Sequence, residues 1–308
     1  MNGDLKMIIK QYHHPDDFLR IVDFIQTIRP LSWRLDYPSR MDLEELLVLP
    51  EIQHQTTLWE DDQGNLMAFT IIDPYHNLLF DILPETNFQE MAKRIVEWAI
   101  DILKNKADAI CLDASCREED TKRCTFFSKN GFILQEERSI HMQRSLKLPI
   151  PRPEFPDGFI IKPLAGEQEL TNYVQLHQTV FATTHMTKEM RLAIMRSSDY
   201  VPELDLVLVN PKGQLVGFLH CQLDKNEIDQ TGIKAAWTDP IGIHPGYRKS
   251  KLARNLLLYG LNLLSQRGME LAHLATLSTN TGAIKTFQSV GFEIKESRVW
   301  WRKIIKPA

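Results

Sequence analysis

Hydrophobic residues follow two different periods along the second half of the chain. Short runs rich in Val, Ile and Leu are typical of strands, and apolar residues that recur every three or four positions are typical of helices. The strand-like runs lie at residues 159–164, 205–210, 214–222, 237–243, 271–276 and 293–304. The helical runs lie at residues 167–182, 187–196, 252–266 and 281–290. Residues 224–235 fit neither period and predict a loop.

The helical run at residues 252–266 carries the clearest amphipathic pattern. Its apolar face comprises Leu252, Leu256, Tyr259 and Leu263. Gly268 follows the last turn and is a typical helix stop. Strands and helices are mixed along the chain, and the turn residues at 210–213 favour an antiparallel hairpin. The pattern therefore predicts an α+β fold, in which mixed, mostly antiparallel twisted sheets are flanked by helices.

The chain also repeats itself after about 150 residues. Three landmarks occur in the same order in both halves: an Ile-Ile-Lys run, a glycine-led hydrophobic run that ends in Phe, and a Phe followed by Gly-Phe. They lie at residues 8–10, 64–69 and 127–132 in the first half and at residues 160–162, 213–218 and 287–292 in the second. The repeat predicts two tandem domains of the same architecture.

A proline-rich segment marks the joint between the two copies. Residues 149–156 include Pro149, Pro151, Pro153 and Pro156, which continue neither a helix nor a central strand. We therefore expect a first domain at residues 1–148, a linker at 149–156 and a second domain at 157–308. The second copy is longer between its landmarks, and the extra length falls around residues 237–254. That segment is where we expect chemistry.

Composition and charge restrict the classes of function. The 308 residues carry 36 Lys and Arg against 40 Asp and Glu, a net charge of -4, with no long basic run. This balance disfavours nucleic acid and anionic membranes as partners, because both are bound by clustered cations. No apolar stretch approaches the roughly 18 residues that cross a bilayer, and the start has no apolar signal core, so we expect a cytoplasmic protein. The four cysteines and ten histidines lack ligand spacing, so we expect no metal.

The junction between the strand at 237–243 and the helix at 252–266 is the candidate site. The start of a helix presents unpaired N–H groups and the positive end of the helix dipole, which together attract anions. Arg248, Lys249 and Lys251 add three cations there. A diphosphate would suit such a loop. The alternative is a solvated basic turn before an ordinary surface helix.

Residues around this junction fit two sequence elements of a known family. The first element is a strand of pattern Val-x-Val-x-Pro-x-Tyr-Arg that enters a glycine-rich loop, and it is met by Ile241, Ile243, Pro245, Tyr247, Arg248 and Ala253. The second is met by Asn280, Ala283, Gly291 and Phe292. Over about 60 residues the chain thus resembles the GNAT superfamily of acetyl-CoA-dependent N-acetyltransferases. With the repeat, the whole chain resembles a tandem GNAT protein, similar in layout to mycothiol-synthase-like members.

The resemblance implies acetyl-CoA as cosubstrate and gives each part of it a place. The strand backbone would pair with the pantetheine arm like an added strand, and the loop amides would hold the diphosphate. The implied cofactor-binding residues are Ile241, Gly242, Ile243, Arg248, Lys249, Ser250, Lys251, Leu252, Ala253 and Asn280. Asp239 is the implied base that takes the proton of the acceptor amine. A carboxylate that caps a turn is the alternative for Asp239.

Two positions depart from the family pattern. The first glycine of the loop is replaced by Lys251, although glycine allows a phosphate to approach the backbone closely. The tyrosine that many members use to protonate the leaving thiolate is replaced by Phe287. An alkyl thiolate, whose acid has a pKa of about 8.5, can leave without that proton donor. We therefore expect weakened catalysis, and not its absence.

The first copy lacks a counterpart of this loop. Where the loop should lie, residues 81–90 are acidic and contain no glycine. Glu85 and Glu90 would repel a diphosphate from the start of the helix predicted at 89–103. We expect a degenerate GNAT-like domain that keeps the architecture and binds no acetyl-CoA.

Three functions are compatible with these features. The leading hypothesis is direct transfer of an acetyl group from acetyl-CoA to the primary amine of a small molecule, at one active site in the second domain. The alternative is a CoA-binding sensor or interaction protein that is derived from a GNAT enzyme and has lost turnover. The third is a structural paralogue that binds no nucleotide.

Overall fold

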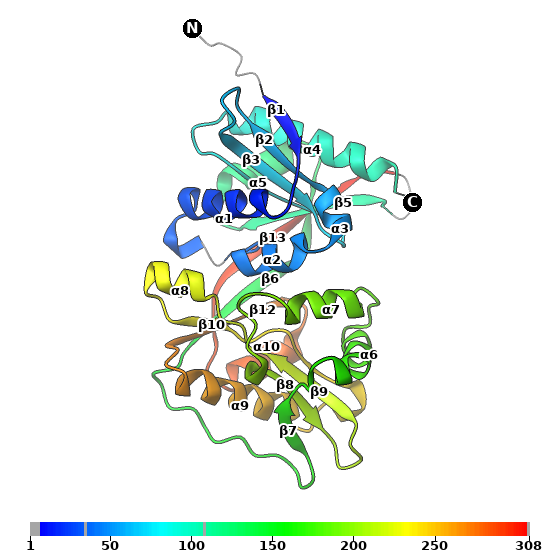
Figure 1. Cartoon of the computed structure of the whole chain (residues 1–308), viewed down its shortest axis with the longest axis vertical. Helices are drawn as coiled ribbons and strands as arrows, with labels where there is room; N and C mark the ends of the chain where they lie inside the picture. The colour runs from blue at the N-terminus through cyan, green and yellow to red at the C-terminus, as the bar shows by residue number, and fades with distance from the viewer. Residues whose placement is uncertain (1–6, 34–35, 107–108, 307–308) are drawn as a thin grey trace. The chain divides into compact units, whose positions relative to one another are not determined.

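The computed structural model describes residues 7–33, 36–106 and 109–306, and the chain forms two compact units (Figure 1). Unit 1 comprises residues 1–138 together with residues 298–308, and unit 2 comprises Ser139–Ser297. Each unit combines mostly antiparallel strands with flanking helices, so the predicted α+β class is confirmed. Within the described ranges, no helix is both long and apolar enough to span a bilayer.

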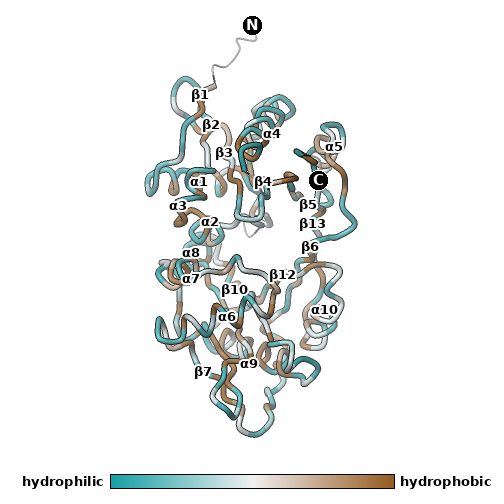
Figure 2. The backbone as a smooth tube through the Cα atoms, turned by 90° about the vertical axis from the view of Figure 1, so that its right-hand side faces the viewer, coloured by the Kyte–Doolittle hydropathy of each residue, from teal (hydrophilic) through white to brown (hydrophobic). Residues whose placement is uncertain are grey.

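Unit 1 is built on a six-strand sheet whose described pairs are antiparallel, except that β4 and β5 run parallel. The strands in order are β1 (Ile8–Gln11), β2 (Thr56–Glu60), β3 (Leu66–Ile72), β4 (Asn77–Ile82), β5 (Cys111–Arg117) and the second part of β13 (Glu293–Ile304). The helices are α1 (Asp16–Ile28), α2 (Arg40–Leu47), α3 (Pro50–His54), α4 (Phe88–Lys104) and α5 (Thr121–Lys129). Figure 2 shows the hydrophobic course of β3 and β4 beside the amphipathic α4, which together form much of the core.

Unit 2 holds two groups of strands. The antiparallel group has the order β11 (Ile241–Ile243), β9 (Leu215–His220), β8 (Asp205–Val209) and β7 (Ile160–Pro163). In the second group β12 (Leu271–Leu277) lies between β6 (Ile133–Ser145), which is antiparallel to it, and β10 (Ala235–Trp237), which is parallel. The helices are α6 (Leu170–Phe181), α7 (Lys188–Met195), α8 (Lys225–Thr231), α9 (Leu252–Gln266) and α10 (Thr281–Gln288).

Helix α9 has the bounds that its apolar period predicts. Leu256, Leu257 and Leu261 are fully buried and pack against Ala272 and Leu274 of β12 in one core cluster. Burial of each such leucine side chain stabilises the unit by roughly 1.5–3 kcal/mol. The start of α9 is therefore held rigidly beside the strands.

The duplication is visible in equivalent backbone turns. After α5 the N–H of Phe132 donates to the carbonyl of Phe127 at 3.1 Å, and after α10 the N–H of Phe292 donates to the carbonyl of Phe287 at 3.1 Å. The intervening glycine has a positive φ in both units. Only a residue without a Cβ adopts this conformation freely, which is why the Gly-Phe landmark occurs in both copies.

The compact units do not divide at the proline-rich segment 149–156, because the final strands of the two halves are exchanged. β6 closes the first half of the sequence, yet its residues from Ser139 onward pair with β12 of unit 2. β13 closes the second half, yet its residues 298–304 pair with β5 of unit 1. Both strands follow the same Gly-Phe landmark, so local sequence does not indicate which sheet each strand joins.

Two segments of unit 2 differ from the sequence-based expectation. The predicted loop at 224–235 contains α8, whose first turn is capped by Asp224 and whose end is set by Gly232 in the left-handed conformation. The single strand predicted at 237–243 is instead two short strands, β10 and β11. Pro240 lies between them and has no N–H to donate to a neighbouring strand.

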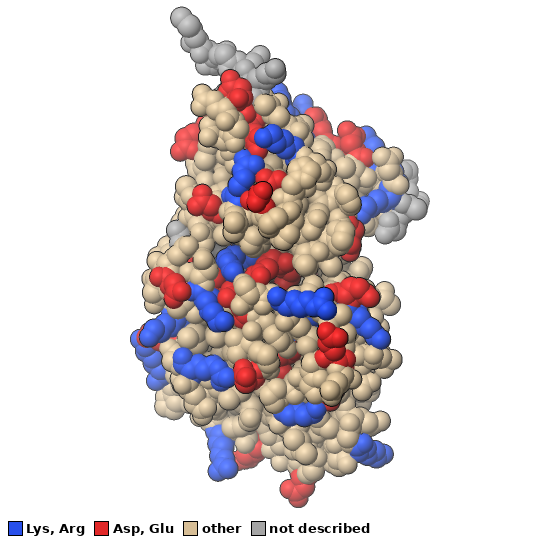
Figure 3. Space-filling model, viewed as in Figure 1, with Lys and Arg blue, Asp and Glu red and all other residues tan. Residues whose placement is uncertain are grey.

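Charges are mixed over one face of the molecule. In the face drawn in Figure 3, Lys and Arg alternate with Asp and Glu, and no area of one sign extends over it. This distribution gives no sign of the continuous basic surface that a nucleic-acid backbone requires.

Candidate functional site

In unit 2 the parallel strands β10 and β12 separate from each other where β10 ends. Trp237, the last residue of β10, pairs in parallel with His273 of β12. Beyond Pro240 the chain joins the other group of strands, where β11 pairs with β9. β11 is the edge strand of that group, so within the described part of the chain its outer edge has no strand partner. Such an edge can accept an added extended chain.

The register of β11 determines which groups face this open edge. The N–H of His244 donates to a carbonyl of β9 at 2.8 Å. The N–H of His220 on β9 donates at 3.1 Å to the carbonyl of Pro240, directly before β11. In an antiparallel pair, bonded and non-bonded positions alternate. Gly242 is therefore bonded to β9, whereas Ile241 and Ile243 turn their N–H groups toward the open edge. These are the groups that a pantetheine amide chain could bind.

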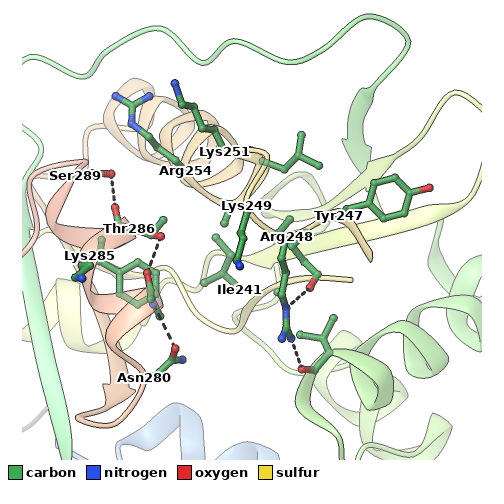
Figure 4. Close-up of a pocket in the computed structure, with 18 of the residues that line it drawn as sticks. Ile241, Tyr247, Arg248, Lys249, Lys251, Arg254, Asn280, Lys285, Thr286 and Ser289 are labelled. Carbon is green, nitrogen blue, oxygen red and sulfur yellow. Dashed lines mark hydrogen bonds between the residues drawn. The ribbon is translucent and has the colours of Figure 1, made fainter. Parts of the chain in front are cut away.

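A cavity of about 750 Å³ adjoins this edge, the start of α9 and the start of α10 (Figure 4). Ser250 is not among its lining residues. The other nine residues predicted to bind the cofactor all line it, namely Ile241, Gly242, Ile243, Arg248, Lys249, Lys251, Leu252, Ala253 and Asn280. The sequence analysis did not single out several further lining residues, among them Val180, Phe181, Gly282, Lys285, Thr286 and Ser289.

The start of α9 has the geometry of an anion-binding loop. The first backbone bond of the helix runs from the N–H of Asn255 to the carbonyl of Lys251 at 3.0 Å. Among the described residues, the N–H groups of 251–254 have no acceptor. Lys249 and Lys251 have φ angles of 63° and 61°, the left-handed conformation in which glycine is favoured. Lys251 thus keeps the backbone form of the glycine that it replaces.

The cationic side chains of this loop differ in their contacts. In Figure 4 Lys251 extends beside Arg254, away from Asn280. Arg248 instead donates to the carbonyl of Val180 at 3.1 Å and to that of Ile243 at 3.4 Å. Arg248 therefore ties the end of α6 to β11, and the exposed cations nearest the helix start are lysines.

Asn280 and Phe287 belong to the opposite wall of the cavity. The side chain of Asn280 caps α10 by accepting from the N–H of Ala283 at 3.3 Å. Phe287 is 5% exposed, packs in the core of unit 2 and is also one of the residues that line the cavity. Among the described lining residues there is no tyrosine at the end of the cavity formed by α10.

Asp239, the predicted base, is half-buried and lies outside the set of lining residues. Its Oδ2 accepts a hydrogen bond from the N–H of Ala275 on β12 at 3.2 Å. It therefore bridges the two strands at the point where they begin to diverge. Its catalytic role stays a prediction.

A cluster of hydrogen-bonded polar side chains near this point is not predicted by any sequence motif. His141 and His273 are joined by a hydrogen bond of 2.9 Å, and His141 is bonded in turn to Glu296 at 2.9 Å. Burial, together with the neighbouring His141, lowers the pKa of His273 to about 3. These residues come from three different strands, β6, β12 and β13, and their sequence spacing matches no motif.

In unit 1 the equivalent divergence of strands is filled by ion pairs. β4 and β5 pair only at Asn77 and Leu78. Beyond them Asp81 is bonded to Arg29 at 2.6 Å and to Arg123 at 2.5 Å. Although burial alone raises it, these two arginines hold the pKa of Asp81 below its ordinary value. The remaining cavity measures about 70 Å³.

The start of α4 in unit 1 also differs from that of α9. The side chain of Asn87 accepts from the N–H of Glu90, so one of the free amides is already bonded. Glu90 adds a negative charge in the first turn. Both features disfavour a diphosphate at this helix.

Residues 170–292 match the profile of the acetyltransferase (GNAT) family. A mycothiol acetyltransferase from Thermobispora bispora is 27% identical over 172 residues, which cover 53% of this chain and 56% of that protein. The chain thus spans about half the length of the first curated relatives that it matches.

Two solved structures match nearly the whole chain. A GCN5-related N-acetyltransferase from Sphaerobacter thermophilus has a TM-score of 0.72 and 21% identity, covering 98% of this chain and 96% of that one. A tandem GNAT protein from the clavulanic acid biosynthesis pathway has a TM-score of 0.72 and 16% identity, covering 98% and 100%. At these identities the matches establish the fold, which is a tandem arrangement of two such domains.

Proposed function

We propose that this chain, whose residues 170–292 match the acetyltransferase (GNAT) family, transfers an acetyl group from acetyl-CoA to the primary amine of a small molecule. The observation that carries the proposal is the meeting of two features at one cavity. These are the free amides at the start of α9 and the open edge of β11. The single site lies in unit 2.

Each feature fits one part of acetyl-CoA. The amides of residues 251–254, with Lys249 and Lys251 beside them, suit the two negative charges of a diphosphate. The N–H groups of Ile241 and Ile243 suit the amide carbonyls of pantetheine. An N–H of this edge that reaches the thioester carbonyl would stabilise the negative charge that develops on its oxygen.

The transfer itself is a direct displacement. The amine nitrogen forms a bond to the thioester carbon, the carbon–sulfur bond breaks, and CoA leaves as its thiolate. The protein holds the thioester, excludes water around it and receives the proton of the amine. Proximity of the two reactants supplies much of the acceleration in such reactions.

Substitution of Phe287 by tyrosine is expected to raise kcat by about three- to tenfold, because general acid assistance becomes available to the leaving thiolate. Phe287 lines the cavity at the position where many members of the resembled family have the tyrosine, so the substitution restores the hydroxyl of that pattern. Initial rates of thiol release measure kcat, and calorimetry measures the Kd of acetyl-CoA. A lower kcat with unchanged Kd would show that the thiolate leaves elsewhere.

We further propose that unit 1 binds no acetyl-CoA. Its strand divergence is occupied by arginine–aspartate pairs, and an acidic first turn replaces the basic loop. Titration calorimetry of acetyl-CoA is therefore expected to give one site per chain. A stoichiometry of two would contradict this assignment.

The activity is tested by following free thiol as acetyl-CoA reacts with a panel of primary amines. The panel should contain an amino sugar, a polyamine, an amino acid ester and a dipeptide. Acetyl-CoA that binds once per chain and reacts with at least one amine supports the proposal. Absence of binding removes the proposed site.

The second candidate function is a CoA-binding sensor without turnover. It is favoured by Phe287, since the site has no tyrosine hydroxyl at that position. Binding of acetyl-CoA without thiol release across the panel is the result expected for the sensor. Reproducible thiol release that requires both amine and protein excludes it.

A further inference from the structure

Unit 2 contains a chain of hydrogen bonds that the site described above does not use. It runs from Glu296 of β13 to His141 of β6 and on to His273 of β12, and we name it the Glu-His-His relay. Both hydrogen bonds measure 2.9 Å. Trp237 of β10 stacks on His141 with ring centroids 5.2 Å apart. The relay therefore has fixed geometry within one compact unit.

The relay lies on the sheet face opposite α9. Along β12, His273 alternates with Ala272 and Leu274, which pack in the core with α9. Along β6, His141 precedes Met142, which belongs to the same core. The two histidines therefore share the other face of the strands.

The carboxylate fixes the direction of the relay. An ionised carboxylate only accepts hydrogen bonds, so His141 donates to Glu296 from Nδ1. The Nε2 of a neutral His141 then carries a lone pair, and it accepts a hydrogen bond from the Nδ1–H of His273. The Nε2 of His273 is left as a lone pair, which is the form that accepts a proton.

This terminal nitrogen has no hydrogen-bond partner among the described residues. His273 is 5% exposed, and its Nε2 is buried without a hydrogen bond within the described chain. The Nε1 of the adjacent Trp237 is likewise buried and unpartnered. Buried polar atoms without hydrogen-bond partners are rare. Here, in the part of the chain that the structure describes, the Nε1–H of Trp237 is a free donor and the Nε2 of His273 is a free acceptor in the same cluster of rings. A bound group that both donates and accepts hydrogen bonds would suit this pair.

The position of His273 relates it to the proposed reaction. His273 is opposite Trp237 at the last residue of β10, directly before the strands diverge. Two residues further along β12, the N–H of Ala275 is bonded to Asp239. The relay thus ends beside the point of divergence, whereas the cavity adjoins β11 further along the chain and His273 is not among its lining residues.

We propose that His273 is a catalytic residue which takes the proton of the attacking amine at Nε2, with His141 and Glu296 as positioning residues. This inference rests on the proposed acetyl transfer. As the carbon–nitrogen bond forms, the N–H bond of the amine breaks and its proton binds Nε2. The Nδ1–H of His273 passes to His141, and the Nδ1–H of His141 passes to Glu296. The electron pair of the carbon–sulfur bond leaves with the thiolate.

His273 alone is a weak base, so the transfer depends on the rest of the relay. Burial and the neighbouring His141 lower its pKa to about 3, while Glu296 acts in the opposite direction. The ring is therefore neutral over the whole physiological range, and it takes up a proton at Nε2 only as its Nδ1–H passes to His141. A buried imidazolium is costly, whereas the relay leaves both rings neutral and places the proton on Glu296, whose side chain is 18% exposed.

Replacement of His273 by glutamine is expected to lower kcat by about 100- to 1,000-fold, with the Kd of acetyl-CoA changed by less than about twofold. The assay uses the most reactive amine of the panel. His220→Gln is the matched control, because His220 is also fully buried, has a pKa lowered by burial to about 4 and belongs to the neighbouring group of strands. The control is expected to keep kcat within about threefold of the wild type.

Glu296→Gln tests the direction of the relay. The glutamine amide can donate to His141, which inverts both tautomers and places a hydrogen on Nε2 of His273. We expect kcat to fall by at least about tenfold without loss of acetyl-CoA binding, and the pH–rate profile to follow the ionisation of the free amine. Ring ¹⁵N chemical shifts of the wild type should show Nδ1–H on both His141 and His273.

The outcomes separate the two proposals. A wild-type protein that transfers no acetyl group contradicts the proposed function itself. A wild-type protein that is active, with His273→Gln equally active, contradicts only the relay. An Nε2–H tautomer at His273, or a loss of rate in Asp239→Asn that His273→Gln does not share, also contradicts the relay.

Discussion

Replacement of Lys249 and Lys251 together by glutamate is expected to weaken acetyl-CoA binding by about ten- to 100-fold, equivalent to about 1.4–2.8 kcal/mol. Both lysines line the cavity at the start of α9 and are exposed. The change replaces two attractive charges beside the diphosphate by two repulsive ones. Stability should not fall with affinity, because acidic residues at a helix start are themselves stabilising.

A matched variant separates local from overall charge. Lys188, Lys212 and Lys225 are exposed lysines of unit 2 outside the cavity, and any two of them replaced by glutamate give the same change in net charge. Calorimetry should show that this control keeps the wild-type Kd. Equal Kd values for the two variants would place the diphosphate somewhere other than the start of α9.

Trp301→Ala is expected to destabilise the N-terminal part of the chain by about 3–5 kcal/mol, although Trp301 lies near the C-terminus. Trp301 is 7% exposed and packs in the core of unit 1, with its ring 6.0 Å from that of Phe127. It belongs to the exchanged part of β13, which pairs with β5. The cavity left by its removal would therefore open in unit 1.

Hydrogen exchange read by mass spectrometry locates the effect of this substitution. Protection is expected to fall in β3, β4 and β5, while α9 and the affinity for acetyl-CoA stay as in the wild type. Trp300→Ala is the control, since Trp300 is half-buried and points to the other face of the same strand. Loss of protection in α9 and not in β5 would contradict the strand exchange.

Sequence periodicity predicts most elements of unit 2 because each forms from local signals. The apolar face and the glycine stop fix both ends of α9. The sequence pattern does not predict helix α8, because this short helix has no apolar face. Its ends are set by the caps Asp224 and Gly232 instead. The exchange of β6 and β13 is not predictable from local sequence, since equivalent strands of a duplicated chain carry the same signals.

Sequence motifs likewise predict only part of the candidate site. The cofactor loop is found from sequence because its residues are contiguous and their spacing reflects one turn at a helix start. Val180 and Phe181 line the same cavity from α6, about 60 residues earlier, and carry no motif. The Glu-His-His relay is assembled from three separate strands and depends on burial, which sequence spacing does not report.

The most direct test of the proposed acetyl-CoA site is a crystal structure of the chain soaked with acetyl-CoA. We expect one molecule per chain, with diphosphate oxygens within hydrogen-bonding distance of the amides of residues 251–254 and the pantetheine arm along Ile241 and Ile243. Density for acetyl-CoA between β4 and β5 of unit 1, or a diphosphate remote from the start of α9, would contradict this site.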